Sequence, residues 1–276
     1  MAEIKAADVA KLRKATGAGM MDCKKALVEA DGDFEKAVEA IRKKGKAIAN
    51  KRADREASEG VVLSGVTEDK KNGVVVVLNC ETDFVAKNAD FIALTQKFLN
   101  QALADLPEDL DALKALTIDG VSIADLVLEQ TGVIGEKLDL SYYGKVSGEC
   151  VVNYIHPGNR LATVVAFNKA LPNEQLGKDV AMQIAAMNPV AIDKDDVSEE
   201  IINKELEIGR EQARQEGKPE EMLDRIAQGK LGKFFKENTL LNQAFVKDSK
   251  KDIRTYLKEN DPELKVVAFK RYGLSN

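Results

Sequence analysis

The sequence is poor in the residues that form metal sites and nucleophilic catalytic centres. Its 276 residues include three cysteines and a single histidine, His156. The cysteines, Cys23, Cys80 and Cys150, are far apart and odd in number, which argues for a reducing cytosol and predicts a cytoplasmic protein. Because no histidine pair, Cys-x-x-Cys spacing or calcium-loop pattern occurs, we expect no bound metal.

Phosphate-binding loops are missing as well. Neither a Gly-x-Gly-x-x-Gly segment nor a Walker-type loop occurs. Residues 16–19 are rich in glycine but lack the Lys-Ser/Thr pair that would hold phosphate and magnesium, so they are interpreted as a turn between helices. A catalytic Cys80–His156 pair stays open, although buried cysteines are far commoner. We expect no enzyme, no catalytic residue, no cofactor and no direct nucleotide binding.

Long apolar runs are also absent. No run approaches the roughly 18 residues that a membrane helix needs, and the first residues lack the apolar region of a secretory signal, so we expect no membrane contact. A hydrophobic content of 44% can build a core, and the net charge of −5 gives no general case for nucleic-acid binding. The basic stretch 42–55 is the exception, either as a solvated linker or as a contact with RNA or an acidic partner.

Apolar periodicity predicts a mixed, α+β chain. Three helical stripes over residues 6–44 predict a small N-terminal helical unit. Apolar runs then predict strands near 61–63, 74–78, 148–155, 160–167 and 266–269, with helices near 88–104, 122–135, 180–187, 198–216 and 248–259. The expected domains are residues 1–55 with the basic tether, a core N-subdomain at 56–145, a core C-subdomain at 146–197, a helical hairpin at 198–238, and a closing helix and strand at 239–276.

The most informative segment is the decapeptide 79–88, Asn-Cys-Glu-Thr-Asp-Phe-Val-Ala-Lys-Asn. It follows the buried strand predicted over 74–78 and precedes a helical pattern, and binding residues tend to lie in such connections. Asp83 and Phe84 therefore stand at a strand-to-helix junction. Their structural alternative is a core anchor for Phe84 and a helix cap for Asp83, but Phe84 fits the period of neither neighbouring element.

Six segments of the chain resemble the bacterial elongation factor Ts family and occur in the family's order. They are residues 12–27, 79–88, 134–137, 156–158, 182–186 and 243–246. The resemblance implies a guanine-nucleotide exchange factor for the translational GTPase elongation factor Tu. It also implies an N-terminal ubiquitin-associated-like domain of three helices, a core of two β-hairpin/helix subdomains, and a projecting helical hairpin.

The resemblance further implies roles for four residues of the decapeptide. Phe84 would enter an apolar cleft between helices of elongation factor Tu. Asp83, with Thr82 and Val85, would hold loops near the partner's magnesium ion in a shifted position. Magnesium demands near-ideal octahedral geometry, so a small displacement of its ligands is costly.

A second contact with the partner is implied for Met20, Met21, Lys24 and His156. Ordinary helix packing is the alternative for Met20 or Met21, because both cannot face the same way. A role in stabilising its turn is equally compatible with His156. A homodimer and a 2:2 assembly with elongation factor Tu both stay open.

Two other functions compete with nucleotide exchange. One is a ubiquitin-associated-type adaptor with an unrelated core, against which the matches outside the first domain argue. The other is an RNA-binding accessory protein of translation that uses the basic stretch. It predicts RNA binding that depends steeply on salt and survives substitution of Phe84.

Overall fold

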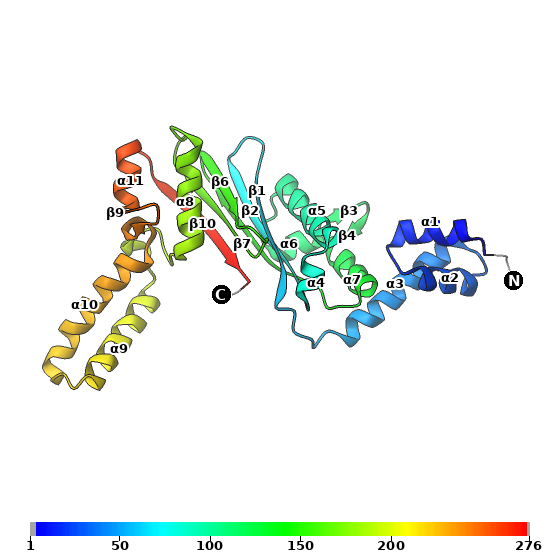
Figure 1. The fold of residues 1–276 in the computed structure, drawn as a ribbon, viewed down its shortest axis with the longest axis horizontal. Coiled ribbons are helices and arrows are strands. Elements are labelled where there is room, and N and C mark those ends of the chain that lie inside the picture. The colour runs from blue at the N-terminus through cyan, green and yellow to red at the C-terminus, as the bar shows by residue number, and fades with distance from the viewer. Residues whose placement is uncertain (1–3, 275–276) are drawn as a thin grey trace. The chain divides into compact units, whose positions relative to one another are not determined.

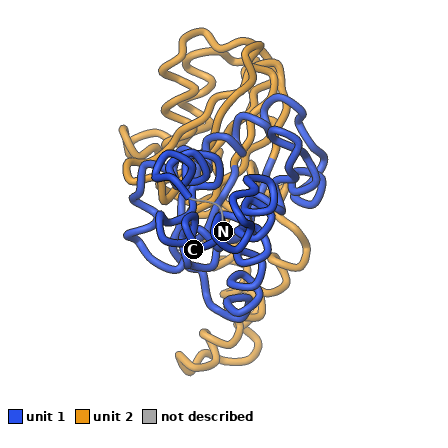
Figure 2. Tube along the Cα trace, turned by 90° about the vertical axis from the view of Figure 1, so that its right-hand side faces the viewer, with its two compact units in different colours: residues 1–63, 76–144, 274–276 blue, residues 64–75, 145–273 orange. Residues whose placement is uncertain are grey.

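The computed structural model describes residues 4–274 and combines helices with small sheets, as predicted for an α+β protein (Figure 1). The chain divides into two compact units. Of the described residues, the first contains 4–63, 76–144 and 274, and the second contains 64–75 and 145–273 (Figure 2). Each unit thus combines segments that are distant in the sequence.

Three helices open the first unit: α1 (Ala6–Thr16), α2 (Met20–Glu29) and α3 (Phe34–Lys51). Gly17 ends α1 with a φ of 71°, a left-handed conformation that favours glycine. Asp33 caps α3 by accepting a hydrogen bond from the Lys36 backbone N–H at 3.1 Å. The predicted N-terminal helical unit is therefore present, around a buried core of Val9, Leu12, Cys23, Leu27 and Ala37.

The basic stretch 42–55 is largely helical. Residues 42–51 continue α3, which corrects the expectation of a linker or tether there, although most of their lysines are exposed as expected. Two of its basic side chains form ion pairs with carboxylates of α7 (Ile123–Ile134): Arg42 with Glu129 at 2.8 Å, and Lys46 with Asp125 at 3.1 Å. The helix continues because small residues such as Ala49 extend its buried stripe beyond the N-terminal core.

Helix α3 touches α7 through glycine. A Cβ on Gly132 of α7 would lie 2.1 Å from the Cα of Gly45 on α3. A Cβ on Gly45 would lie 3.6 Å from its nearest atoms, the Glu129 carbonyl oxygen and the Gly132 Cα. The two backbones can therefore meet this closely only because position 132 carries no side chain.

A three-stranded sheet in the order β1-β2-β5 follows α3 in the chain, formed by β1 (Glu59–Val66), β2 (Asn72–Cys80) and β5 (Asp139–Ser147). The apolar run Val74–Leu78 is completely buried within β2, as its unbroken hydrophobicity predicted. The remaining elements of the first unit are α4 (Asp83–Ala86), α5 (Ala89–Asp105), α6 (Leu110–Ala115), β3 (Thr117–Ile118), β4 (Val121–Ser122) and α7.

The second unit is built on an antiparallel sheet in the order β10-β7-β6, formed by β6 (Cys150–Ile155), β7 (Leu161–Phe167) and β10 (Val266–Gly273). The C-terminal run around Val266 was predicted to join a core sheet, and Val266 pairs with Phe167 of β7. Helix α8 (Glu174–Met187) contributes Leu176, Val180 and Ile184 to the buried core that β7 shares.

A helical hairpin of α9 (Glu199–Gln215) and α10 (Glu220–Asn238) lies where the sequence predicted one (Figure 1). The helices approach closely at Gly209, where a Cβ would lie 3.0 Å from the Ala227 Cα. Between the helices, ion pairs join Arg210 to Asp224 at 2.6 Å and Arg214 to Glu220 at 2.9 Å.

The end of the chain differs from the predicted helix over 248–259. Asp248–Asp252 form strand β9, which pairs with β8 (Ala244–Phe245), and only Ile253–Asn260 form helix α11. Asp252 caps α11 by accepting from the Thr255 backbone N–H at 2.7 Å, and this fixes where the helix begins. Short 3₁₀ turns occupy Lys194–Asp196 and Leu240–Asn242.

Candidate partner-binding site

The decapeptide forms a tight junction between β2 and a single helical turn, α4. Thr82 is extended, with φ −124° and ψ 153°, and its hydroxyl accepts a hydrogen bond from the Val85 backbone N–H at 3.4 Å. Thr82 is therefore the helix cap, and Asp83 is the first helical residue. The predicted site residues Thr82, Asp83, Phe84 and Val85 are thus brought together on one turn.

Phe84 projects into solvent. Its side chain is 83% exposed, while Cys80 and Ala86 on either side of it are buried. The alternative interpretation of Phe84 as a core anchor is therefore wrong. The Phe84 ring is accessible to a partner, on a turn flanked by buried residues.

Asp83 forms an ion pair with Lys87 on the next turn, with 2.6 Å between the carboxylate oxygen and Nζ. The hydrogen bond from Lys87 holds the pKa of Asp83 below its ordinary value. Both side chains are well exposed, so this pair contributes little to stability. The carboxylate is ionised at neutral pH and accessible to a partner.

A second set of contacts anchors the residues just before Phe84. The Thr82 backbone N–H and hydroxyl both donate to the Glu136 carboxylate, at 3.0 and 2.7 Å. Glu81 accepts from the Lys137 backbone N–H at 2.6 Å and from the Arg52 guanidinium at 2.7 Å. These hydrogen bonds, above all the one from the Lys137 backbone N–H, hold the pKa of the Glu81 carboxyl below its ordinary value. Sequence reasoning noted residues 134–137 as a landmark but assigned them no contact.

Cys80 is buried and unsuited to nucleophilic chemistry. Burial, followed by the nearby negative charge of Glu136, raises the pKa of its thiol to about 12. The thiol donates instead to the Thr82 carbonyl oxygen at 3.1 Å. The thiolate that a nucleophile requires is therefore scarce at neutral pH, and Cys80 acts as a structural support of the junction.

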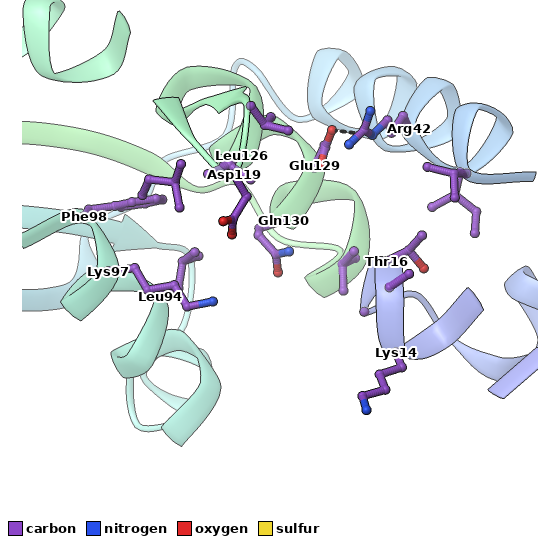
Figure 3. A pocket seen from close by; sticks show the side chains of 17 residues that line it. Lys14, Thr16, Arg42, Leu94, Lys97, Phe98, Asp119, Leu126, Glu129 and Gln130 are labelled. Atoms are coloured by element: carbon purple, nitrogen blue, oxygen red, sulfur yellow. Dashed lines mark ion pairs between the residues drawn. The ribbon is translucent and has the colours of Figure 1, made fainter. Parts of the chain in front are cut away.

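A cavity of about 490 Å³ lies beside α4. Val85 forms part of its wall, with residues from the end of α1, from α5 and from α7. An adjoining cavity of about 400 Å³ shares six lining residues with it: Lys14, Gly17, Leu94, Lys97, Gln130 and Val133 (Figure 3). In Figure 3 the side chains of Leu94 and Lys97 on α5 and Gln130 on α7 line this second hollow. Val85 thus connects the exposed turn with a concave surface of the first unit.

The predicted second contact on α2 is exposed at all three positions. Met20 is 47% exposed and Met21 is 76% exposed, so packing in the helical core does not account for either side chain. Lys24 is also exposed. Asp22, between them, forms an ion pair with Lys44 of α3 at 2.6 Å, which ties this face of α2 to α3.

His156 lies in the second unit, in the exposed turn between β6 and β7. Its backbone N–H donates to the Leu161 carbonyl at 2.8 Å, and its carbonyl accepts from Asn159 at 3.0 Å. The ring nitrogen Nδ1 lies 2.9 Å from the Tyr154 hydroxyl. These contacts are those expected of a residue that stabilises its own turn.

Residues 4–274 lack two other kinds of site. No group of three or more His, Cys, Asp or Glu side chains in this range could hold a metal ion. Within the same range, no helix is both long and apolar enough to cross a membrane.

Comparison with known proteins gives a consistent result. The family model described as elongation factor TS matches residues 81–276. The chain is 57% identical over 270 residues to elongation factor Ts of Porphyromonas gingivalis, covering 97% of each chain. It is 52% identical to that of Christiangramia forsetii, covering 99% of this chain and 100% of the relative, and 44% identical to that of Bacteroides fragilis, covering 97% and 98%.

Proposed function

This chain belongs to the elongation factor Ts family of translation elongation factors, and on that premise we propose that it is a guanine-nucleotide exchange factor for elongation factor Tu. The proposed substrate is the partner's GDP complex, and the proposed outcome is GDP release followed by GTP loading. The chain itself makes or breaks no covalent bond and binds no nucleotide in this scheme.

The observation that carries the proposal is the exposure of Phe84 on an anchored turn. The Phe84 side chain is 83% exposed in the free protein, and its burial against a partner would stabilise the complex by about 2–3 kcal/mol. Its turn is fixed at both ends, by the Thr82 cap and by Asn88, whose side chain accepts from the Asp90 backbone N–H at 2.8 Å. Little conformational entropy is therefore lost when Phe84 enters an apolar cleft.

The partner's magnesium site would be the target. With Phe84 inserted, Asp83, Thr82 and Val85 would hold partner loops away from the position that magnesium coordination requires. A displaced ion leaves the phosphate charge poorly neutralised, because magnesium tolerates little departure from octahedral geometry. A factor that binds the nucleotide-free partner more tightly weakens nucleotide binding by the same ratio, since the two equilibria are linked.

Met20, Met21 and Lys24 would supply the second contact. Methionine side chains adapt to irregular surfaces, and both are exposed here. His156 would be a further contact with the partner, made from the second unit. Its ring nitrogen Nδ1 lies 2.9 Å from the Tyr154 hydroxyl.

The direct test is release of a fluorescent GDP from elongation factor Tu, followed by stopped flow with and without this protein. Acceleration at substoichiometric amounts is the expected result. Phe84→Ala should slow the release by about tenfold or more, if the lost burial is worth about 1.4 kcal/mol or more in the transition state. Met222→Ala is the matched control, because Met222 is an exposed apolar residue, at 42%, on the helical hairpin.

Two results would count against the proposal. Absence of acceleration, with both proteins folded, would remove the exchange function. Normal exchange by Phe84→Ala would remove Phe84 from the mechanism. RNA binding that falls steeply with salt and survives Phe84→Ala would instead favour the RNA-binding alternative.

A further inference from the structure

The segment 134–137 has no role in the proposed mechanism, yet its side chains hold the residues that precede Phe84. It begins at Ile134, the last residue of α7, and continues through the left-handed Gly135 at φ 80°. Glu136 is partly buried, and both of its carboxylate oxygens accept hydrogen bonds from Thr82. A carboxylate that takes two donors from one residue fixes the orientation of that residue as well as its distance.

The Thr82 hydroxyl has two tasks that depend on each other. It carries one proton and two lone pairs. The hydroxyl donates a hydrogen bond to Glu136 at 2.7 Å, and it accepts one from the Val85 backbone N–H at 3.4 Å. Because the O–H points toward Glu136, the lone pairs of the hydroxyl face the first turn of α4. Glu136 thereby sets the cap on which the direction of Phe84 depends.

A reciprocal contact joins the same two segments. The backbone N–H of Lys137 donates to Glu81, while the Lys137 ammonium donates to the carbonyl oxygens of Ala53 and Arg55 at 2.7 and 2.9 Å. Residues 52–55, 81–82 and 136–137 therefore form one hydrogen-bonded cluster. Within this cluster, Glu136 is the residue that contacts Thr82, which immediately precedes Asp83 and Phe84.

We propose that Glu136 is a positioning residue for nucleotide exchange, which acts by fixing Thr82 and through it the direction in which α4 presents Phe84. The inference rests on the proposed exchange function for its consequence, but its structural part concerns the free protein alone. Glu136 touches no partner in this scheme and acts entirely through Thr82.

The first experiment uses the free chain and needs no partner. Because the sequence contains no tryptophan, Phe84→Trp introduces a single indole at the exposed position. Its time-resolved fluorescence anisotropy reports how firmly the turn is held. Adding Glu136→Ala should lower the residual anisotropy of the indole, whereas Glu136→Gln, which keeps an acceptor for Thr82, should restore part of it.

Two further variants define the result. Glu129→Ala removes a glutamate of the preceding helix, α7, together with its ion pair to Arg42, and should leave the indole anisotropy unchanged. Thr82→Val removes the hydroxyl from the other side of the contact and should reproduce the Glu136→Ala loss. Unchanged anisotropy in both Glu136→Ala and Thr82→Val, with native circular dichroism, would overturn the inference.

The second experiment measures exchange in a double-mutant cycle. Glu136→Ala alone should slow GDP release by about tenfold, because Thr82 loses both of its charge-assisted hydrogen bonds to Glu136. In the Phe84→Ala background the same change should slow it much less, because the side chain whose direction Glu136 sets is already absent. Effects that multiply instead would assign Glu136 an independent role and overturn the inference. If the unmodified chain does not accelerate release, the exchange proposal fails while the anisotropy result still decides the contact.

Discussion

The crossing of α3 and α7 gives the sharpest prediction about stability, because two facing glycines should respond oppositely to the same substitution. In Gly132→Ala the new Cβ would lie 2.1 Å from the Gly45 Cα, and 3.1 Å from its carbonyl carbon. These are backbone atoms, so no side chain can rotate away. In Gly45→Ala the nearest atoms are 3.6 Å away, which is ordinary van der Waals contact.

The magnitude follows from that geometry. Carbon atoms in contact prefer about 3.5–4.0 Å, so Gly132→Ala requires α3 and α7 to separate locally by about 1.5 Å. Overpacking of this kind costs about 1–3 kcal/mol, and the gain in helix propensity over glycine returns about 1 kcal/mol. Because only backbone can move, the upper end of the cost applies, and we expect a net loss of about 2 kcal/mol. The same propensity term makes Gly45→Ala neutral or slightly stabilising.

Urea denaturation followed by circular dichroism measures the difference, with hydrogen exchange of α3 as the local readout. Gly229→Ala is the matched control, since Gly229 lies within α10 and no heavy atom falls within 4 Å of an added Cβ. It should raise the free energy of unfolding by about 0.5–1 kcal/mol. Should Gly132→Ala prove as stable as Gly229→Ala, with α3 amides equally protected, the close crossing would be refuted.

Two further predictions concern titratable groups. Burial of Asp179 opposes its ionisation, but hydrogen bonds led by that of Lys247 outweigh this and lower its pKa from 3.8. The resulting stabilisation is complete above that ordinary value and is lost as the pH falls through the lowered pKa. Asp179→Asn should therefore cost about 1–3 kcal/mol at pH 7, and thermal unfolding scans should show the difference shrinking below pH 4. For the thiols, Cys150 is partly exposed while Cys23 and Cys80 are buried, so a disulfide reagent at pH 8 should modify one thiol rapidly in the folded protein and three in denaturant. Rapid reaction of Cys80 in the native state would contradict its burial.

Much of the fold follows from local sequence signals. The run Val74–Leu78 is apolar at every position and becomes the fully buried part of β2, and the apolar run within 160–167 yields β7. Strand β5 was not predicted, because Tyr, Ser, Gly and Lys interrupt its apolar pattern. Its position in the sheet depends on pairing with distant residues, which no local period reveals. Helix α3 was cut short for a similar reason, since the partners of its basic residues are supplied by α7.

Part of the candidate site can likewise be predicted from the sequence, and part of it cannot. The junction of a strand with a helix, and an aromatic residue that fits neither period, single out Phe84 in the sequence alone. The hydrogen bonds from Thr82 to Glu136 join residues 54 positions apart, so nothing in the decapeptide indicates them. The assignment of the cap also required the structure, because Thr82 and Asp83 are both favourable at a helix N-terminus and only their backbone angles decide between them.

On the proposed function, the energetics require more than one contact with the partner. A nanomolar nucleotide complex represents about 12 kcal/mol, and weakening it a thousandfold needs about 4 kcal/mol of differential binding. Complete burial of Phe84 supplies about 3 kcal/mol at most, so the wedge alone falls short. Met20 and Met21 can supply the remainder only if they engage at the same time as Phe84.

Simultaneous engagement depends on how firmly α2 and α4 are held within the first unit. The crossing at Gly132 of α7 fixes α3, to which α2 is joined, and Glu136, two residues after the end of α7, fixes the start of α4. Gly132→Ala should therefore slow GDP release even though residue 132 is remote from the proposed wedge, and Gly45→Ala should not.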